Sequence, residues 1–174
     1  DFGGAVNVME YCRIYDDCRD HDDSGAVYPN SPVSYGSVMR YNDVSASVGL
    51  CSGIHLDDFC CGVTLYGNIL RNVGHFGVFL SGGRDLTIAN NIFTACWGGI
   101  RLDNRGLFWP DQVVRTNTFD TLEKRHGIAT GPFGRRYPRI ADWYRDDGKL
   151  AHAPMGNVWA NNLFLDLFGS ASTL

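Results

Sequence analysis

The amino-acid sequence predicts an all-β solenoid, in which coils of three short parallel strands stack on one another and share a ladder of asparagine side chains. Two repeated columns of residues lead to this prediction. In the first column an asparagine returns within short apolar phrases, with steps of 26, 23, 26 and 45 residues between Asn42, Asn68, Asn91, Asn117 and Asn162. Such periods are typical of solenoids, because each repeat buries the apolar face of its neighbour.

Asparagine suits the repeated position for two reasons. It tolerates the left-handed backbone region better than other residues with a side chain, so it can turn a strand sharply. Its amide can also hydrogen-bond the identical amide one coil above and below. The phrase around Asn42 aligns with the phrase around Cys12, which places Cys12 in the same column. The long step before Asn162 predicts one coil with a long insertion, or two irregular coils.

The second column consists of short strands that begin at a glycine. In the clearest of them the first and third residues after the glycine are large and apolar, so we expect these to point inward and the intervening residues to point outward. The five segments of this column are 25–28, 53–56, 77–80, 99–102 and 127–130.

A third short strand precedes each asparagine, as in 63–66 and 86–89. We therefore expect three strands per coil and about five to six coils. The prediction is one domain over residues 1–174, with loop insertions at about 104–112 and 131–156.

Composition limits the classes of partner. A hydrophobic content of 44% and the lack of helical apolar periodicity favour one all-β domain. A net charge of -4 argues against nucleic acid, and the lack of an apolar run of 18 residues argues against a membrane span. The sequence starts at Asp1 without a signal peptide, and we expect a piece of a larger protein. Uncapped solenoid ends would favour end-to-end self-association.

The six cysteines are spaced too irregularly to be paired from the sequence. Cys12 and Cys96 suit ladder or core positions as small apolar groups. Cys51, Cys60 and Cys61 flank one coil in loop-like sequence, so a disulfide between Cys51 and its neighbours is an option in an exported protein. A zinc site lacks the paired CxxC spacings that would support it.

The phrases at 53–58, 81–85 and 90–93 resemble those of secreted bacterial carbohydrate-active proteins of the pectate-lyase-like superfamily, whose fold is a right-handed parallel β-helix. The similarity covers about residues 22–164. It implies a secreted or extracytoplasmic protein that binds a polysaccharide or oligosaccharide across the outward face of the glycine-led strands. That superfamily includes hydrolases, lyases, esterases and fibres, so the resemblance does not select one reaction.

The outward residues of this column are the candidate site. The first outward position holds Val27, His55, Phe79, Arg101 and Ala129, and the next holds Pro29, Asp57, Ser81, Asp103 and Gly131. Taken one by one, a histidine here can be merely solvated and an aspartate can simply begin a turn. Their occurrence on one face is the argument for a site.

The acids are spaced for glycoside hydrolysis. Asp57 and Asp103 lie two coils apart, so their backbones should be about 9 to 10 Å apart. Carboxyl groups about 6.5 to 9.5 Å apart suit an inverting glycosidase, and a tilt of Asp58 could supply the shorter retaining distance. We expect Arg101 to hold Asp103 ionised as the base. Asp57 or Asp58 would be the acid if aromatic walls such as Phe59 raise its pKa.

The loop insertions supply aromatic and arginine side chains that can stack on sugars and bind acid groups. Together with the outward column, the expected substrate-binding residues are His55, Phe79, Arg101, Arg105, Trp109 and Trp143. The alternative is that these aromatics pack the loop onto the coil, and that Asp103 and Arg105 form only a local ion pair in a turn.

Two other functions stay open. A lyase would need a base such as Arg101, Lys124 or Arg125, and calcium held by the aspartates. A hydrolase needs neither a cofactor nor a metal. A fibre or adhesin subunit would stack end to end and would not need Asp57.

Overall fold

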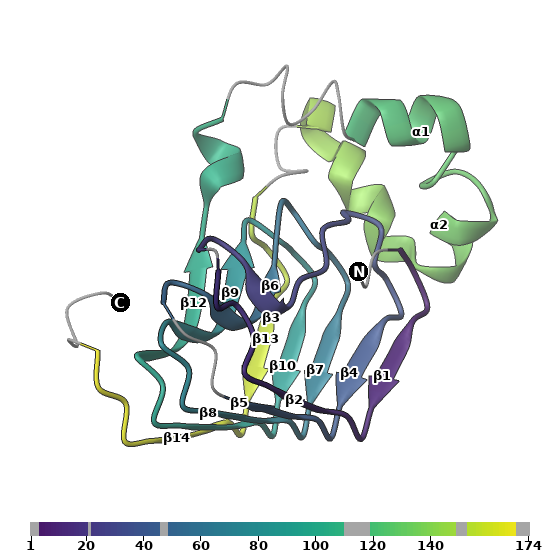
Figure 1. The fold of residues 1–174 in the computed structure, drawn as a ribbon. Helices are drawn as coiled ribbons and strands as arrows, with labels where there is room; N and C mark the ends of the chain where they lie inside the picture. The colour runs from purple at the N-terminus through teal and green to yellow at the C-terminus, as the bar shows by residue number, and fades with distance from the viewer. Residues whose placement is uncertain (1–3, 21, 46–48, 110–118, 149–152, 170–174) are drawn as a thin grey trace.

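The computed structural model describes residues 4–20, 22–45, 49–109, 119–148 and 153–169. Three parallel sheets wind around one axis, and each strand pairs with the equivalent strand of the next coil (Figure 1). The predicted solenoid with three strands per coil is therefore confirmed. Two sheets have five strands and the third has four, so the stack has about four turns rather than the five to six that we expected.

The strands are short in all three sheets. Sheet A consists of β1 (Val8–Glu10), β4 (Val38–Arg40), β7 (Thr64–Tyr66), β10 (Thr87–Ala89) and β13 (Val158–Ala160). Sheet B consists of β2 (Arg13–Tyr15), β5 (Asp43–Ser45), β8 (Ile69–Arg71), β11 (Ile92–Thr94) and β14 (Leu163–Leu165). Sheet C consists of β3 (Gly25–Val27), β6 (Ser52–Leu56), β9 (Phe76–Ser81) and β12 (Gly98–Asp103).

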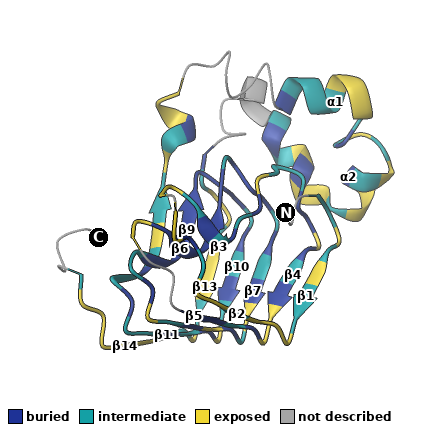
Figure 2. Ribbon diagram, in the orientation of Figure 1, coloured by how far each residue is buried: buried dark blue, intermediate teal, exposed yellow. Residues whose placement is uncertain are grey.

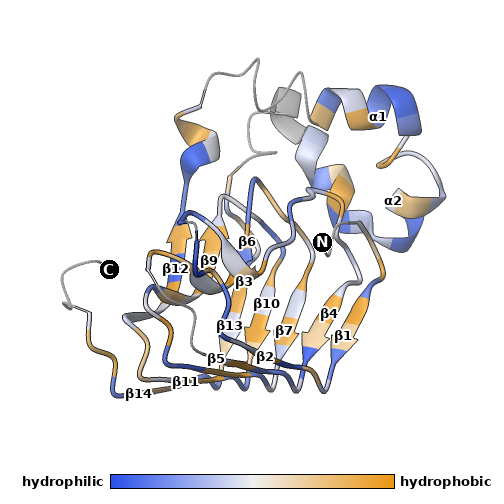
Figure 3. Ribbon diagram, in the orientation of Figure 1, coloured by the Kyte–Doolittle hydropathy of each residue, from blue (hydrophilic) through white to orange (hydrophobic). Residues whose placement is uncertain are grey.

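The core lies inside the coils, where aliphatic side chains of the three sheets meet. Sheet C contributes Ile54 and Leu56 from β6 and their register partners Val78 and Leu80 from β9, all of which are buried. The inward direction predicted for these residues is therefore confirmed, whereas the intervening residues His55 and Phe79 are buried and do not face solvent. Burial is deepest in the middle coils and falls at the end strands β1 and β13 (Figure 2), and apolar residues follow the strands (Figure 3).

The asparagine ladder forms as predicted between sheets A and B. The side-chain amides of Asn42, Asn68 and Asn91 each donate to the amide oxygen of the next coil at 3.0 Å, and Asn162 ends the series. Each oxygen also accepts the backbone N–H of the preceding ladder residue, including that of Cys12 at 3.0 Å. The ladder thus satisfies buried backbone and side-chain groups in every coil.

The sharp turn beside the ladder is made one residue earlier than we expected. The left-handed residues are those that precede the ladder side chain, at Tyr11, Tyr41, Gly67, Asn90 and Asn161. The ladder asparagines themselves are needed for their amides and not for a left-handed backbone.

Residues 104–157 form one long excursion between β12 and β13, which corrects two expectations. Thr87 in β10 pairs directly with Val158 in β13, and Asn91 bonds directly to Asn162, so no coil lies between them. Asn117 lies outside the described residues. The expected strand at 127–130 is wrong, because Gly127 ends a helix in the left-handed conformation and Ile128 packs into a separate apolar cluster.

The excursion is helical in its described part, contrary to the all-β expectation. It contains the 3-10 helix η1 (Arg105–Leu107), the α-helices α1 (Thr121–His126) and α2 (Pro132–Arg136), and the 3-10 stretch η3 (Pro138–Gly148). Its apolar residues pack on Tyr35, Phe59 and Cys61, which belong to the turns that leave sheet C. The helices therefore form a second small core beside the coils (Figure 1).

All six cysteines are free thiols, so the disulfide considered between Cys51 and its neighbours is not formed in this structure. Cys96 is buried in the coil, whereas Cys12 is exposed at the end of the ladder. Within the described ranges, no helix is both long and apolar enough to cross a membrane.

Candidate functional site

The outer face of sheet C carries a row of stacked rings. His55 in β6 and Phe79 in β9 are register partners, and their rings stack with centroids 4.6 Å apart. The Arg101 guanidinium in β12 lies 4.8 Å from the centre of the Phe79 ring. Tyr28, just after β3, meets the other side of His55 edge-on at 5.1 Å. One side chain per coil thus builds a continuous stack.

His55 is only 2% exposed, although we expected it to face solvent. The rings of Tyr28 and Phe79 cover it on both sides. Its Nε2 atom lies 2.8 Å from the Ser81 hydroxyl oxygen and 3.3 Å from Asp57 Oδ1. His55 Nε2 is thus shared between the Ser81 hydroxyl and the Asp57 carboxylate, and Ser81 is itself fully buried. This geometry does not support a serine nucleophile.

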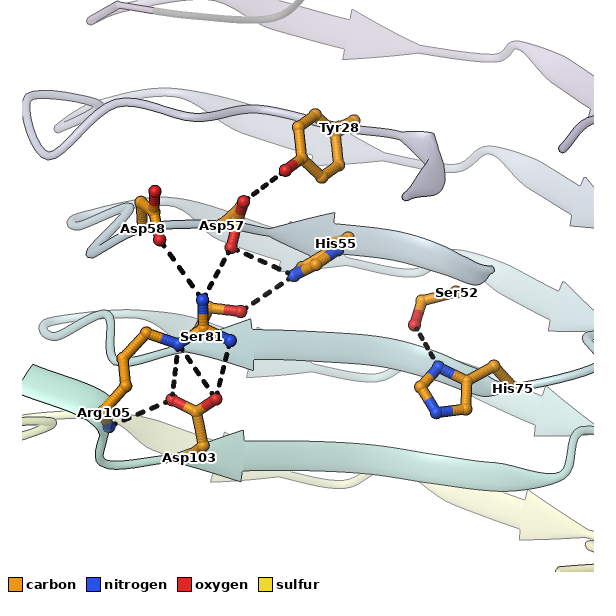
Figure 4. A network of polar contacts seen from close by, with 9 residues as sticks. All are labelled: Tyr28, Ser52, His55, Asp57, Asp58, His75, Ser81, Asp103 and Arg105. Atoms are coloured by element: carbon orange, nitrogen blue, oxygen red, sulfur yellow. Dashed lines mark hydrogen bonds and ion pairs between the residues drawn. The ribbon is translucent and has the colours of Figure 1, made fainter. Parts of the chain in front are cut away.

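The three candidate acids meet at one guanidinium (Figure 4). Arg105 donates from one terminal nitrogen to Asp57 Oδ1 and to Asp58 Oδ1, both at 3.2 Å. Its other terminal nitrogen and its Nε donate to Asp103 Oδ2 at 2.8 and 3.0 Å. The expected ion pair of Asp103 with Arg105 is therefore present, but the same arginine also joins Asp103 to the other two acids.

The partner of Asp103 differs from our expectation. Arg101 does not hold this carboxylate in the described structure, since its guanidinium packs over the rings of Phe76 and Phe79. Arg105 follows the end of β12 and folds back over the strand ends, which brings it to Asp103. Arg105, which lies beyond the end of β12, thus pairs with Asp103 in place of Arg101, which lies within the strand.

Asp57 and Asp58 have opposite electrostatic environments. Burial of Asp57 favours its neutral form, but hydrogen bonds from His55 and Tyr28 outweigh burial and hold the pKa of this carboxyl well below its usual range. Burial raises the pKa of the Asp58 carboxyl, and the neighbouring Asp57 charge raises it further, against the opposing effect of Arg105. Asp58 is also the more accessible, with 40% of its side chain exposed against 11% for Asp57. Neighbouring carboxyls with pKa values pushed apart are typical of acid-base sites.

Tyr28 is a site residue that the sequence prediction missed. Its hydroxyl donates a short hydrogen bond to Asp57 Oδ2. We aligned Gly25 with Gly53, but Gly25 pairs with Ser52 and Val27 pairs with Ile54, so Val27 points into the core and not outward. Aligning the aliphatic Val27 with Ile54 would have found Tyr28, because a one-residue shift exchanges the two faces of a strand.

The predictions for the first and last residues of the two outward columns are also corrected. Ala129 and Gly131 belong to the helical excursion and not to sheet C. At the other end Asn30, rather than Pro29, bridges to Asp57. The remaining members, from His55 to Asp103, occupy the register that we expected.

The two tryptophans of the predicted site have different environments. Trp109 is 37% exposed, and its ring lies 5.5 Å from the Arg105 guanidinium and 5.7 Å from the ring of Phe59. Trp143 is fully buried in the second core against Phe119 and Tyr35, so it cannot contact a substrate. The alternative that this aromatic packs the loop onto the coil is correct for Trp143.

A second polar pair lies on the same sheet, away from the acids (Figure 4). The Ser52 hydroxyl and His75 Nδ1 are 3.2 Å apart, and the His75 ring stacks on Trp97. Burial lowers the pKa of His75, and the charges of Arg101 and His55 lower it further. His75 is therefore held neutral beside the arginine.

Comparison with known proteins identifies the fold but does not identify a reaction. A family model described as a right handed beta helix region matches residues 2–119, which is more than half of the chain. No curated protein and no solved structure gives a significant match to the chain.

Proposed function

This chain belongs to the right-handed beta-helix family, and we propose that it binds a polysaccharide across the outer face of sheet C and hydrolyses glycosidic bonds with Asp58 and Asp103. The observation that carries the proposal is the pair of environments around Arg105. The Asp58 side chain is 40% exposed and its pKa is raised. The Asp103 carboxyl, in contrast, accepts hydrogen bonds from two nitrogens of Arg105.

In the proposed reaction Asp58 is the general acid. Its raised pKa keeps a larger fraction of the carboxyl protonated, so that it can give a proton to the leaving glycosidic oxygen. Asp103, paired with Arg105, activates a water on the opposite side of the sugar. The intervening coil places the two strand ends about 9 to 10 Å apart, which favours inversion.

Asp57 receives a different role from the one we expected. A carboxyl with a strongly depressed pKa is a poor acid near neutral pH. We assign it to positioning, because it fixes both Tyr28 and His55 and shares Arg105 with Asp58. Arg101, Phe79 and Trp109 would contact sugar rings at the edges of this face.

An enzyme acting on polysaccharide would work outside the cytoplasm, and no nucleic acid or membrane is needed as a partner. The lyase alternative is weaker, because Arg105 already neutralises the aspartates that would hold calcium. Lys124 and Arg125 lie in the last turn of α1 and not on sheet C.

The test is turnover on a panel of neutral and acidic polysaccharides. We expect new reducing ends, and we expect Asp58→Asn and Asp103→Asn each to lower the rate by about 100-fold or more. Asp16→Asn is the matched control, because Asp16 is an exposed left-handed aspartate at the end of β2 in sheet B. Wild-type rates in both site variants would contradict the proposal, and ultraviolet-absorbing unsaturated ends would indicate elimination instead.

A fibre or adhesin subunit is the second candidate, and exposed apolar side chains favour it. Trp159 in β13 and Phe164 in β14 are 49% and 45% exposed, although their partners Ile88 and Phe93 are fully buried. End-to-end packing of two solenoids would cover Trp159 and Phe164. In that case the purified chain sediments as concentration-dependent assemblies, and Asp58→Asn changes nothing.

A further inference from the structure

Two buried cysteines from neighbouring coils lie near the start of sheet C, at the end away from the acids of the candidate site. Cys18 is in the loop between β2 and β3 and is 4% exposed, and Cys51 directly precedes β6 and is fully buried. Their side chains are close enough to interact. The other buried thiols differ in this respect, since the Cys61 and Cys96 sulfurs donate to backbone carbonyls of Phe59 and Leu70.

The backbone holds the two segments together on both sides of Cys51. The Leu50 N–H donates to Asp22 Oδ1 at 3.1 Å, and the Ser52 N–H donates to the Ser24 carbonyl at 3.0 Å. The pairing of Gly25 with Ser52 places Cys51 opposite Ser24, and Cys18 lies in the loop that leads into this segment, so its side chain reaches Cys51 from the loop. A disulfide between the two requires Cα atoms about 4.4 to 6.8 Å apart.

We infer that Cys18 and Cys51 are a redox pair that closes to a disulfide when the protein is exposed to an oxidising thiol-disulfide buffer. In this step the two S–H bonds break and one S–S bond forms. The two electrons reduce the disulfide of the oxidant, and the two thiols that it forms take up the two protons.

The electrostatics of the pair set the rate of the step and not its outcome. Burial raises the pKa of the Cys18 thiol to about 12, and the neighbouring Cys51 raises it as well. Because the thiolate is the attacking species, the oxidation is slow near neutral pH and becomes faster as the pH rises.

The disulfide would fix the strand that covers the site. Cys18 precedes β3, and β3 leads into Tyr28, which donates to Asp57 and packs on His55. Closing the loop between Cys18 and Cys51 restricts the unfolded chain and ties the start of β3 to β6. The oxidised protein should therefore hold Tyr28 over His55 more firmly.

The experiment maps the cross-link and its effect on the full chain. The purified protein is incubated with reduced or oxidised glutathione, alkylated after denaturation, and digested with trypsin and Asp-N, which separates Cys51 from Cys60 and Cys61 at Asp57. We expect a peptide of residues 17–19 joined to one of residues 43–56, found only after oxidation. We also expect the melting temperature to fall by several degrees on reduction.

Two variants make the result specific. Cys51→Ser should lose both the cross-link and the response of the melting temperature to reductant, whereas Cys12→Ser should behave like the wild type because Cys12 is exposed at the end of the ladder. The inference is overturned if Cys18 and Cys51 are alkylated separately after oxidation, or if Cys51 pairs with Cys60 or Cys61. The wild-type digest decides this even if Cys51→Ser does not fold.

Discussion

The ladder edge and the outer face of sheet C are both built from one polar side chain per coil, yet they follow opposite rules. At the ladder, Asn42, Asn68 and Asn91 repeat the same residue and make the same bond to the next coil. On sheet C the equivalent positions change from aspartate to serine to aspartate, and the two aspartates converge on Arg105.

The difference separates the positions that stabilise this solenoid from those that form its candidate site. Repetition at the ladder satisfies every coil by the same bonds, so its contribution is to the stability of the stack. Variation on sheet C surrounds the adjacent residues Asp57 and Asp58 with unlike groups from neighbouring coils, and the pKa of Asp57 is lowered whereas that of Asp58 is raised. Changes at the ladder should therefore alter folding, and changes on sheet C should alter electrostatics.

The strongest test of this division is Asn68→Ala. The Asn68 amide accepts two hydrogen bonds from Asn42 and donates to Asn91 and to the Met39 carbonyl, and it is fully buried. Its loss leaves several buried groups without a partner, each costing about 1 to 3 kcal/mol. We expect the free energy of unfolding to fall by about 3 to 5 kcal/mol in urea denaturation.

The matched control for this variant is Asn90→Gly. Asn90 is exposed, has a left-handed backbone and lies next to the ladder residue Asn91. Glycine keeps that backbone and removes only an exposed amide, so the loss should be a few tenths of a kcal/mol. Equal losses in Asn68→Ala and Asn90→Gly would show that the ladder does not stabilise the stack.

The same division explains which parts of the fold could be predicted. The coils were predictable because each phrase recurs and fixes its own register. Asn117 occurs in a similar phrase, but its neighbour Asn91 bonds to Asn162, and only the pairing of distant coils decides this. The helix α1 had a local signal that we did not use, namely Gly127 after three basic residues in its last turn.

The site was predictable only where it lies within the regular strands. His55, Phe79 and Asp103 have the register that we expected. Tyr28 was missed because we aligned the glycines and not the aliphatic residues Val27 and Ile54. The role of Arg105 depends on the segment after β12, where the repeat no longer fixes the direction of a side chain. Trp143 is buried because of packing within the helical excursion, which no local pattern of the coil could indicate.

Arg105→Gln sharpens the comparison from the sheet C face. It leaves Asp57, Asp58 and Asp103 close together without their shared cation. We expect the free energy of unfolding at pH 7 to fall by about 2 kcal/mol. Without the arginine the folded-state pKa of Asp58 rises further, so the deficit should grow as the pH rises through it and shrink in acid. Urea denaturation between pH 4 and pH 7 measures this.

Arg101→Gln is the control for that measurement, because the described contacts of Arg101 are the rings of Phe76 and Phe79. It should cost less than about 1 kcal/mol and show no comparable dependence on pH. A pH-independent loss in Arg105→Gln would mean that the arginine acts by packing and does not hold the carboxylates.

Tyr28→Phe has the smallest expected effect and isolates one bond of the network. The change removes the hydrogen bond to Asp57 and keeps the ring against His55, so we expect a loss of about 1 kcal/mol at pH 7. Asp57 has a depressed folded-state pKa, and the stability it contributes is present above its unfolded pKa of about 3.9 and lost as the pH falls toward the folded value. The wild-type advantage should therefore be constant above about pH 5 and shrink below it. Tyr15→Phe, at an exposed tyrosine of sheet B, should have no effect. If Tyr28→Phe is equally silent at every pH, then His55 and not Tyr28 keeps Asp57 ionised.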